Sequence, residues 1–293
     1  MGKIYYGEPE PPLDTTDGDA IRMNPPTTKA DAAAAARAGE IRLDGRRLET
    51  GWWGPSPDIA PTFVLLHEGL GCVALWRDFP ARLAEATGCG VFAYSRFGYG
   101  GSDPAPLPRP LDYMRVEARD VLPRVLDAAG VRRCILVGHS DGASIAAAHA
   151  AEVPDDRVRG LVLIAPHYFV EEMCLASIAQ ARRAYEQGDL RPRLARHHAD
   201  VDNAFRGWND AWLDPAFRTA FDIRALLGQI RVPILQVQGT DDPYGTQAQP
   251  LAAEREARCP VETLMLPGTR HAPHAEAPEV VLDAIAAFAG HFL

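Results

Sequence analysis

The stretch Cys134-Ile135-Leu136-Val137-Gly138-His139-Ser140-Asp141-Gly142 joins a short apolar run to the alanine-rich segment Ala143 to Ala151. The apolar run is typical of a buried strand, and the alanine-rich segment is typical of a helix. The pattern G-x-S-x-G therefore lies where a strand turns abruptly into a helix. Such a corner strains the backbone of Ser140, and the flanking glycines let other backbone approach without a Cβ clash. This context predicts that Ser140 is an exposed nucleophile.

Composition and charge narrow the class of protein. The 293 residues are 47% hydrophobic and 24% charged, which suits one large α/β domain with a sizeable core. The formal net charge is −9, and no basic stripe indicates nucleic acid or anionic lipid as a partner. We therefore expect a small-molecule substrate, no nucleic acid and no membrane.

The cysteines and the first residues indicate where the protein is found. The five cysteines are odd in number, and none forms the C-x-x-C spacing of a zinc site. Residues 1–30 lack the basic region and apolar core of a secretory signal. These features predict a cytoplasmic protein with reduced thiols.

One short segment contains residue types that bind metals. His197-His198-Ala199-Asp200 combines two imidazoles with a carboxylate. Adjacent residues diverge on a helix, however, and no third ligand lies at a suitable spacing. We expect no metal site there, and a surface or packing role instead.

Strand and helix patterns alternate from residue 41 onward. Near-continuous apolar strands that alternate with helices predict a mostly parallel sheet with helices on both faces. The expected strands are 41–43 and 48–53, an antiparallel opening pair, then 62–67, 90–94, 134–137, 160–165, 232–238 and 261–266. The expected helices are 75–86, 111–129 with an interruption at Pro123, 143–151, 247–257 and 277–292.

Two segments depart from this alternation. Residues 1–40 are rich in Pro, Asp, Thr and Gly and predict an N-terminal arm, which wraps the core, mediates a homodimer or stays mobile. Residues 167–229 shift toward Arg, His, Asp and Trp with helical spacing, which predicts an inserted helical cap. The core would then comprise 41–166 and 230–293. Open α/β sheets bind ligands at the carboxyl ends of their strands, so the cap should cover Ser140.

Carboxylates and imidazoles follow the last two expected strands. Asp241 and Asp242 follow the strand 232–238, and His271 follows the strand 261–266. A serine nucleophile needs a histidine base, which in turn needs a carboxylate to orient it. The chain order Ser, Asp, His is the one expected when a strand-to-helix corner is followed by two such strand ends.

Taken together, these motifs resemble the α/β-hydrolase fold superfamily, in its group with a helical cap, over roughly residues 41–292. The resemblance selects Asp242 over Asp241 and His271 over His274, and it implies that no cofactor is needed. The motifs that carry it, besides the corner, are His67-Glu68-Gly69-Leu70-Gly71, Arg96-Phe97-Gly98-Tyr99-Gly100-Gly101-Ser102, Gly239-Thr240-Asp241-Asp242 and His271-Ala272-Pro273-His274.

An acyl-transfer reaction also needs donors for the oxyanion. One is expected to be the Asp141 N–H at the start of a helix, where the helix dipole favours negative charge. The resemblance implies that the other is the Gly69 N–H. The chain departs from the family pattern at Glu68, where a second glycine is commoner. Because a carboxylate would oppose the oxyanion, we expect the Glu68 side chain to point away or to be tied by a hydrogen bond.

The function that these observations favour is hydrolysis of an ester-like bond in a small, mainly apolar substrate through an acyl-enzyme. Hydrolysis of carbon–carbon bonds in ring-cleavage products uses the same three residue types and remains open. A non-catalytic ligand-binding protein on the same fold is a further alternative. Aromatic residues of the cap and the strand ends are the expected substrate contacts, namely Tyr168, Phe169, Phe205, Trp208, Trp212 and Tyr244.

Overall fold

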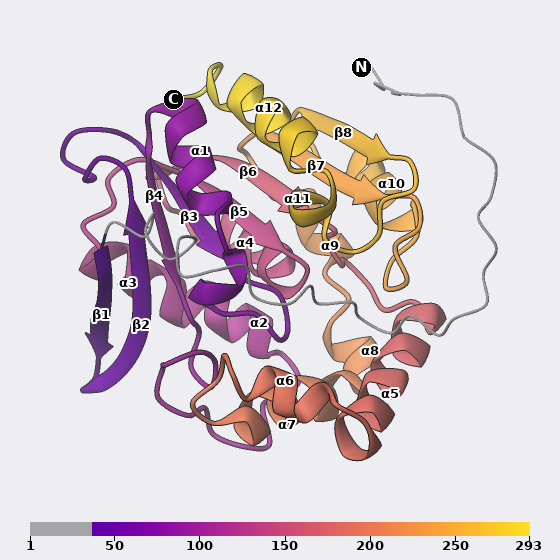
Figure 1. Cartoon of the computed structure of the whole chain (residues 1–293). Coiled ribbons are helices and arrows are strands. Elements are labelled where there is room, and N and C mark those ends of the chain that lie inside the picture. The colour runs from indigo at the N-terminus through magenta and orange to yellow at the C-terminus, as the bar shows by residue number, and fades with distance from the viewer. Residues whose placement is uncertain (1–36) are drawn as a thin grey trace.

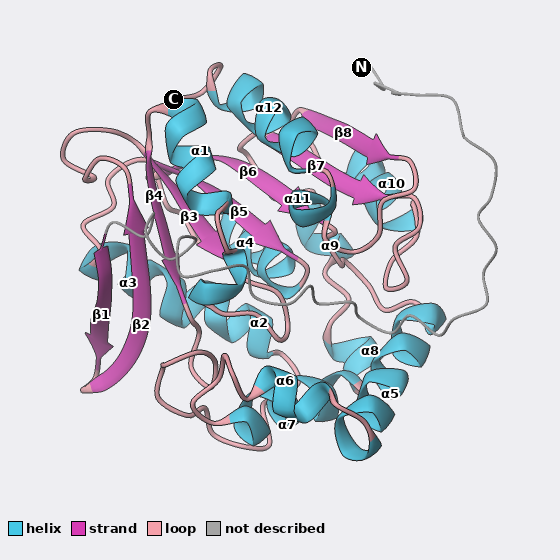
Figure 2. Cartoon of the chain, in the orientation of Figure 1, coloured by secondary structure: helices cyan, strands magenta, loops and turns pink. Residues whose placement is uncertain are grey.

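An eight-stranded sheet organises residues 37–293, the part of the chain that the computed structural model describes (Figures 1 and 2). The strand order is β1-β2-β4-β3-β5-β6-β7-β8. Strand β2 runs against both of its neighbours, and every pairing from β4 to β8 is parallel. The strands are β1 (Arg37–Leu43), β2 (Arg46–Trp53), β3 (Thr62–Leu66), β4 (Gly90–Tyr94), β5 (Cys134–His139), β6 (Val158–Ile164), β7 (Ile234–Gly239) and β8 (Val261–Leu266). The predicted fold class, a mostly parallel sheet in an α/β protein, is confirmed.

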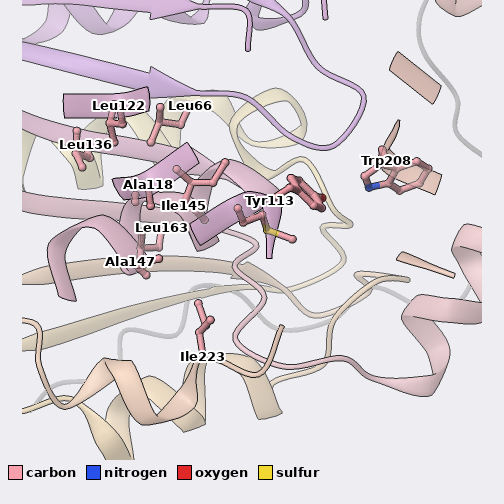
Figure 3. Packing of buried hydrophobic residues seen from close by; sticks show 14 of the residues in the cluster. Leu66, Tyr113, Ala118, Leu122, Leu136, Ile145, Ala147, Leu163, Trp208 and Ile223 are labelled. Carbon is pink, nitrogen blue, oxygen red and sulfur yellow. The ribbon is translucent and has the colours of Figure 1, made fainter. Parts of the chain in front are cut away.

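Helices cover both faces of this sheet. Residues of β3 alternate between two buried clusters, with Leu66 in one and Leu65 in the other, because successive strand residues point to opposite faces. Figure 3 shows the first cluster, where Leu66 lies near Leu136 and Ile145. Outside residues 167–229, which also contribute to this cluster, its helical elements are α2 (Tyr113–Val116), the π-helical turn η3 (Glu117–Val121), α3 (Leu122–Ala128), α4 (Asp141–Glu152) and α10 (Ala248–Glu256). The other face carries the 3₁₀ turn η2 (Val73–Trp76), α1 (Phe79–Thr87) and α12 (Pro278–Ala289), which α11 (Pro273–Glu276) precedes.

Three elements differ from those expected from the sequence by more than small shifts of their ends. The helix expected over 75–86 is divided into the 3₁₀ turn η2 and, after residues 77–78, the helix α1. Strand β1 begins at Arg37, so the last four residues assigned to the arm at 1–40 belong to the sheet, paired with β2. The remainder of that arm, residues 1–36, lies outside the described residues. The helix expected over 111–129 is divided by the π-helical turn η3, after which α3 begins with Pro123 in its first turn. A proline is tolerated there because the first N–H groups of a helix have no intrahelical acceptor.

The segment between β6 and β7, residues 167–229, is helical. Its elements are α5 (Glu172–Gln187), α6 (Leu190–Leu194), α7 (Val201–Trp212), α8 (Phe217–Ala220) and α9 (Arg224–Leu227). Helix α5 packs on α6 and α7, whereas α9 packs on α4 and α10 of the core. In Figure 1, α5 to α8 gather beside the sheet and α9 lies close to it. We call this segment the insertion.

Among residues 37–293, no helix is both long enough and apolar enough to cross a membrane.

Candidate active site

Ser140 occupies the corner between β5 and α4. Its backbone has φ 53° and ψ −116°, a conformation that costs a residue with a side chain about 1–3 kcal/mol. A Cβ added at Gly142 would lie 1.9 Å from the Leu66 carbonyl oxygen, and one at Gly138 would lie 2.3 Å from the Gly142 oxygen. The predicted strained corner with glycines on either side is therefore confirmed. Ser140 is less open than the sequence suggested, with 7% of its surface exposed.

Three side chains from separate strand ends meet at this corner. His271 Nε2 lies 3.0 Å from Ser140 Oγ. On the other side of the ring, His271 Nδ1 lies 2.8 Å from Asp242 Oδ2 and 2.9 Å from Oδ1. The neighbouring carboxylate, Asp241, is exposed and accepts a hydrogen bond from Thr240 instead. The structure thus brings Ser140, Asp242 and His271 together as the sequence predicted.

Buried charges set the protonation of this trio. Burial would raise the pKa of Asp242, but contact with the His271 ring lowers it to about 2. Burial would likewise lower the pKa of His271, yet the Asp242 carboxylate raises it above the ordinary value. The Asp242 carboxylate is also fixed in place, because Gln238 Nε2 and the Tyr244 N–H both donate to it at 2.8 Å. Asp242 therefore stays ionised and stabilises a proton on His271.

Two backbone N–H groups are free within residues 37–293, one at the corner and one in the loop after β3. Within the described chain, neither the Gly69 N–H nor the Asp141 N–H has a hydrogen-bond acceptor, although both residues are buried. The Asp141 N–H is the first of helix α4, where unpaired N–H groups and the helix dipole favour negative charge. A buried N–H without a partner is unfavourable, so these groups are suited to an oxygen atom of a ligand.

Arg96 holds the loop that carries Gly69. Its Nη1 donates to the His67 carbonyl, and its Nη2 donates to the Glu68 carbonyl at 3.0 Å. The His67 ring closes the same loop, because Nε2 accepts from the Arg96 N–H and Nδ1 donates to the Glu68 carbonyl. Burial and the Arg96 charge lower the pKa of His67 well below its ordinary value, which keeps this ring neutral. Hydrogen bonds within the protein therefore hold this loop in place, and they do not require a bound substrate.

The Asp141 side chain belongs to the same buried network. Its Oδ2 accepts from the Tyr113 hydroxyl at 2.5 Å and lies 3.9 Å from Arg96 Nη2, while its Oδ1 accepts from Trp212 Nε1 at 3.3 Å. Burial raises the pKa of this carboxyl, although the Arg96 charge opposes the rise. The side chain has a structural role, whereas the Asp141 N–H has no partner within residues 37–293.

The Glu68 side chain lies between Gly71 and His139. Its Oε2 lies 3.4 Å from Nδ1 of His139, the residue before Ser140, and would be 2.3 Å from a Cβ added at Gly71. Within residues 37–293, His139 Nδ1 makes no hydrogen bond of good geometry. The hydrogen bond expected to tie Glu68 is therefore not formed with His139, although the carboxylate faces this ring.

Comparison with known sequences agrees with this geometry. The sequence model of the Alpha/beta hydrolase family matches residues 63–284, which include the corner and both strand ends that carry Asp242 and His271. This chain belongs to the alpha/beta hydrolase family. A relative from Variovorax paradoxus strain S110, named "Putative carbamate hydrolase RutD", is 35% identical over 202 residues. That alignment covers 61% of this alpha/beta hydrolase and 73% of the relative.

Solved structures share the fold of this alpha/beta hydrolase. The enol-lactonase from Burkholderia xenovorans LB400 superposes with a TM-score of 0.67 at 19% identity, covering 86% of this chain and all of that one. The carboxylesterase CesB from Bacillus subtilis superposes with a TM-score of 0.65 at 20% identity, covering 90% of this chain and 96% of the other. Identities this low show the fold alone.

Three of the six predicted substrate contacts lie beside the site of this alpha/beta hydrolase. The Tyr244 ring is 4.6 Å from the His271 ring, and Trp212 donates to the Asp141 side chain. Trp208, one of the buried cluster residues labelled in Figure 3, lies against Gly69, where an added Cβ would be 2.2 Å from its Nε1.

The rings of the other three predicted contacts are engaged with protein groups, and their role as substrate contacts stays a prediction. Tyr168 is fully buried, and its hydroxyl donates to Gln236 on β7 at 3.2 Å. The Phe205 ring stacks on Tyr185 at 3.7 Å and so packs α7 on α5 inside the insertion. The Phe169 ring lies 4.7 Å from the guanidinium of Arg224. A place near a strand end, or on a helix face rich in aromatic residues, does not determine the direction in which a ring points, so the sequence could not predict these contacts.

His167 is a site residue that the sequence analysis did not single out. Its ring lies 5.7 Å from the His271 ring, and its Nε2 donates to the Tyr244 carbonyl at 3.2 Å. Burial and the neighbouring His271 lower the pKa of His167 to about 4, so the ring is neutral. Its place just beyond β6, beside the strand that carries Ser140, is the signal that could have indicated it.

His198 in the insertion fastens two loops of the core. Its Nδ1 accepts from the Gly100 N–H at 2.9 Å, and its Nε2 donates to the Leu70 carbonyl at 3.0 Å. Both ring nitrogens are therefore occupied, as the packing role expected for this segment requires. In the described part of the chain, no group of three or more His, Cys, Asp or Glu is placed to hold a metal.

Proposed function

We propose that this protein is a serine hydrolase that cleaves an ester-like bond through an acyl-enzyme intermediate. The observation that carries the proposal is the continuous contact from Asp242 through His271 to Ser140, at 2.8 and 3.0 Å. A histidine held in this way takes the serine proton and is stabilised as it becomes charged. The name of the curated relative adds support, because a carbamate, like an ester, presents an acyl carbon that bears a leaving group.

In the proposed reaction, Ser140 Oγ attacks the carbonyl carbon while His271 Nε2 takes the hydroxyl proton. The oxyanion that forms accepts hydrogen bonds from the N–H groups of Gly69 and Asp141, and one such donor contributes about 2.7–4 kcal/mol to the transition state. Collapse of the tetrahedral species breaks the bond to the leaving alcohol, which receives the proton from His271. Water deprotonated by His271 then attacks the acyl carbon, releases the acid and restores Ser140.

The surroundings of Ser140 favour a small, mainly apolar substrate. The rings of Trp208 and Tyr244 lie next to Gly69 and His271 respectively, so aromatic surface borders both the expected oxyanion donors and the base. Of the carboxylates nearest the corner, Asp141 accepts from the Tyr113 hydroxyl and lies 3.9 Å from Arg96 Nη2.

A fluorophosphonate probe tests the nucleophile directly. We expect covalent labelling of the wild-type protein that is lost in Ser140→Ala. Ser177→Ala is the matched control, because Ser177 lies on α5 and donates to the Pro243 carbonyl, and this variant should label normally. A wild-type protein that does not react, with its fold confirmed by circular dichroism, would contradict the proposal.

A substrate screen separates the reaction classes. We expect turnover of p-nitrophenyl esters of short or medium acyl length. Turnover of a ring-cleavage product without ester hydrolysis would instead assign carbon–carbon bond hydrolysis, and binding without turnover would assign a ligand-binding protein. Aryl carbamates belong in the same screen because of the curated relative's name.

A further inference from the structure

The peptide group between Glu68 and Gly69 is hydrogen-bonded on one side and free on the other. Its carbonyl accepts from His67 Nδ1 at 2.7 Å and from Arg96 Nη2 at 3.0 Å. Its N–H, one of the two expected oxyanion donors, has no acceptor within residues 37–293. Because a trans peptide is planar, its N–H points away from its carbonyl oxygen. The two donors on the carbonyl therefore fix the direction of the Gly69 N–H before a substrate binds.

The contacts of the two donors determine their protonation. Burial would lower the pKa of Arg96, but Tyr99 and Asp141 raise it above the ordinary value, so the guanidinium is charged. The His67 ring is neutral, and its Nε2 accepts from the Arg96 backbone N–H at 3.0 Å. The single ring proton of His67 is therefore on Nδ1. The Glu68 carbonyl thus receives one hydrogen bond from a cation and one from a neutral imidazole.

Arg96 also approaches the residue that supplies the other expected donor. Its side chain is buried, and its Nη2 lies 3.9 Å from Asp141 Oδ2. Both hydrogen bonds that the guanidinium makes within residues 37–293 end on the oxyanion loop, at the carbonyls of His67 and Glu68. A buried charge is unfavourable unless other groups compensate it. One buried cation is therefore held by the same two segments that carry the free N–H groups.

A cation that donates to a carbonyl also changes the N–H of the same peptide. Hydrogen bonds in a chain polarise one another, and electrostatic effects are larger in the low dielectric of a buried site. A bond from a charged donor is roughly twice as strong as a bond from a neutral donor. Arg96 should therefore make the Gly69 N–H a stronger donor toward negative charge, besides fixing its direction.

We propose that Arg96 is a positioning residue for the oxyanion donors, with His67 in support. Arg96 directs and polarises the Glu68–Gly69 peptide, and its ion pair joins that peptide to Asp141. It acts through the peptide and touches no reacting atom. The proposal deepens the serine-hydrolase function proposed above and rests on it.

Replacement of the guanidinium by an ammonium tests this role. Arg96→Lys keeps the charge but loses the planar fork that reaches both carbonyls of the loop. We expect kcat for a p-nitrophenyl ester to fall by about 10²-fold, the loss produced by removal of one oxyanion donor, with KM little changed. Arg109→Lys is the matched control, because Arg109 also lies over the Tyr99 ring but donates to the Phe97 carbonyl, outside the oxyanion loop. Its kcat should stay close to that of the wild type.

A thionoester separates positioning of the donors from packing. The sulfur atom that takes the negative charge accepts hydrogen bonds weakly, so it gains little from the oxyanion donors. The ratio of ester kcat to thionoester kcat should fall by about tenfold in Arg96→Lys, as a weakened oxyanion donor requires, and stay unchanged in Arg109→Lys. A role in packing alone would lower both rates equally. An unchanged ratio in a folded R96K protein would overturn the proposal.

Two substitutions of His67 give the same test without altering a buried charge. In His67→Asn, the amide nitrogen takes the place of Nδ1 and still donates to the Glu68 carbonyl. In His67→Gln, the amide reaches the place of Nε2, and that donor is lost. The ratio of ester to thionoester kcat should therefore be lower in His67→Gln than in His67→Asn. The reverse order would overturn the proposal even if Arg96→Lys does not fold.

A substrate-free measurement distinguishes this inference from the proposed function. A donor on a carbonyl draws electrons from the nitrogen of the same peptide, which moves the amide ¹⁵N resonance downfield. In ¹⁵N-labelled protein, the Gly69 resonance should move upfield in Arg96→Lys and stay in place in Arg109→Lys. A Gly69 resonance that does not move in Arg96→Lys would overturn the positioning role, whatever the ester screen shows. A shifted resonance in a protein that fails the fluorophosphonate test would contradict the serine-hydrolase proposal alone.

Discussion

The sheet and the insertion supply the candidate site in different ways. The sheet places Ser140 and His271 by backbone geometry, because each follows the carboxyl end of a parallel strand. The insertion reaches the same place through single side chains, with Trp208 against Gly69 and His198 bonded to the Leu70 carbonyl. The proposed chemistry therefore depends on the path of the main chain at the strand ends. The groups expected to surround a substrate depend instead on single side-chain contacts made by the insertion.

Removal of the acid carried by β7 should have the largest effect on activity. Asp242→Asn keeps the shape of the side chain but no longer holds the tautomer and charge of His271, so kcat should fall by about 10⁴-fold. Asp241→Asn is the matched control, because this neighbour is exposed and contacts Thr240, and its kcat should stay close to that of the wild type. Steady-state kinetics on one ester measures both, and the reverse ranking would refute the assignment of Asp242.

Substitutions of two glycines, one packed against the sheet and one against the insertion, compare the two regions through the free energy of unfolding. Gly142→Ala places a Cβ against the Leu66 backbone and should lower the free energy of unfolding by about 3 kcal/mol or more. Gly69→Ala meets a side chain of the insertion, Trp208, and not backbone, so stability should fall by only about 1 kcal/mol while activity falls more. Urea unfolding measures both variants. Equal losses would show that the insertion is as rigid as the sheet.

The pH dependence of activity tests which region controls the base. The Asp242 carboxylate raises the pKa of His271, and only the neutral ring accepts the Ser140 proton. The acid limb of kcat/KM should therefore have its midpoint above about 6.5, the ordinary histidine value. Because protonated His271 is the stabilised form, its contribution to folding stability is full below the unfolded-state pKa and is lost as pH rises through the folded-state pKa. A midpoint at or below the ordinary value would contradict this account.

The smallest expected effect comes from a side chain of the insertion. Trp208 Nε1 has no hydrogen-bond partner among residues 37–293, so its N–H is free to meet a substrate. Trp208→Phe removes that donor and should lower kcat/KM by about 2- to 10-fold. Because Trp208 is 7% exposed and its ring contacts Phe205, the smaller ring should also lower the free energy of unfolding by up to about 1 kcal/mol.

Trp212→Phe is the control for that substitution. Its N–H donates to Asp141 and Tyr113, so its loss should lower the free energy of unfolding by about 1–3 kcal/mol. A Trp208 variant that loses as much stability as the Trp212 variant would assign Trp208 to packing alone.

The spacing of apolar residues and the order of the motifs along the chain were sufficient to predict the sheet and the approach of Ser140, Asp242 and His271 at its edge. The apolar runs gave β3 to β8 to within a few residues, and strand ends in a parallel sheet converge, so the approach of Asp242 and His271 to Ser140 followed. The choice of Asp242 over Asp241 needed the family resemblance as well, because both residues follow the same strand.

Side-chain direction could not be predicted in the same way. Tyr168 follows β6 as the pattern suggested, yet its ring turns into the core and meets Gln236. Phe205 and Trp208 are three residues apart on α7, but one ring packs inside the insertion and the other lies on Gly69. Glu68 and His139 lie far apart in the sequence, yet their side chains meet, and no local sequence pattern predicts such a contact. These contacts are set by tertiary packing.

The two hydrogen bonds of His198 make one imidazole ring a shared anchor for two loops of the core. Its Nε2 donates to the Leu70 carbonyl, next to Gly69, and its Nδ1 accepts from the Gly100 N–H. A substitution that removed this ring from the insertion would leave both backbone groups without their partner, so a single change far along the chain would reach the loop that carries Gly69.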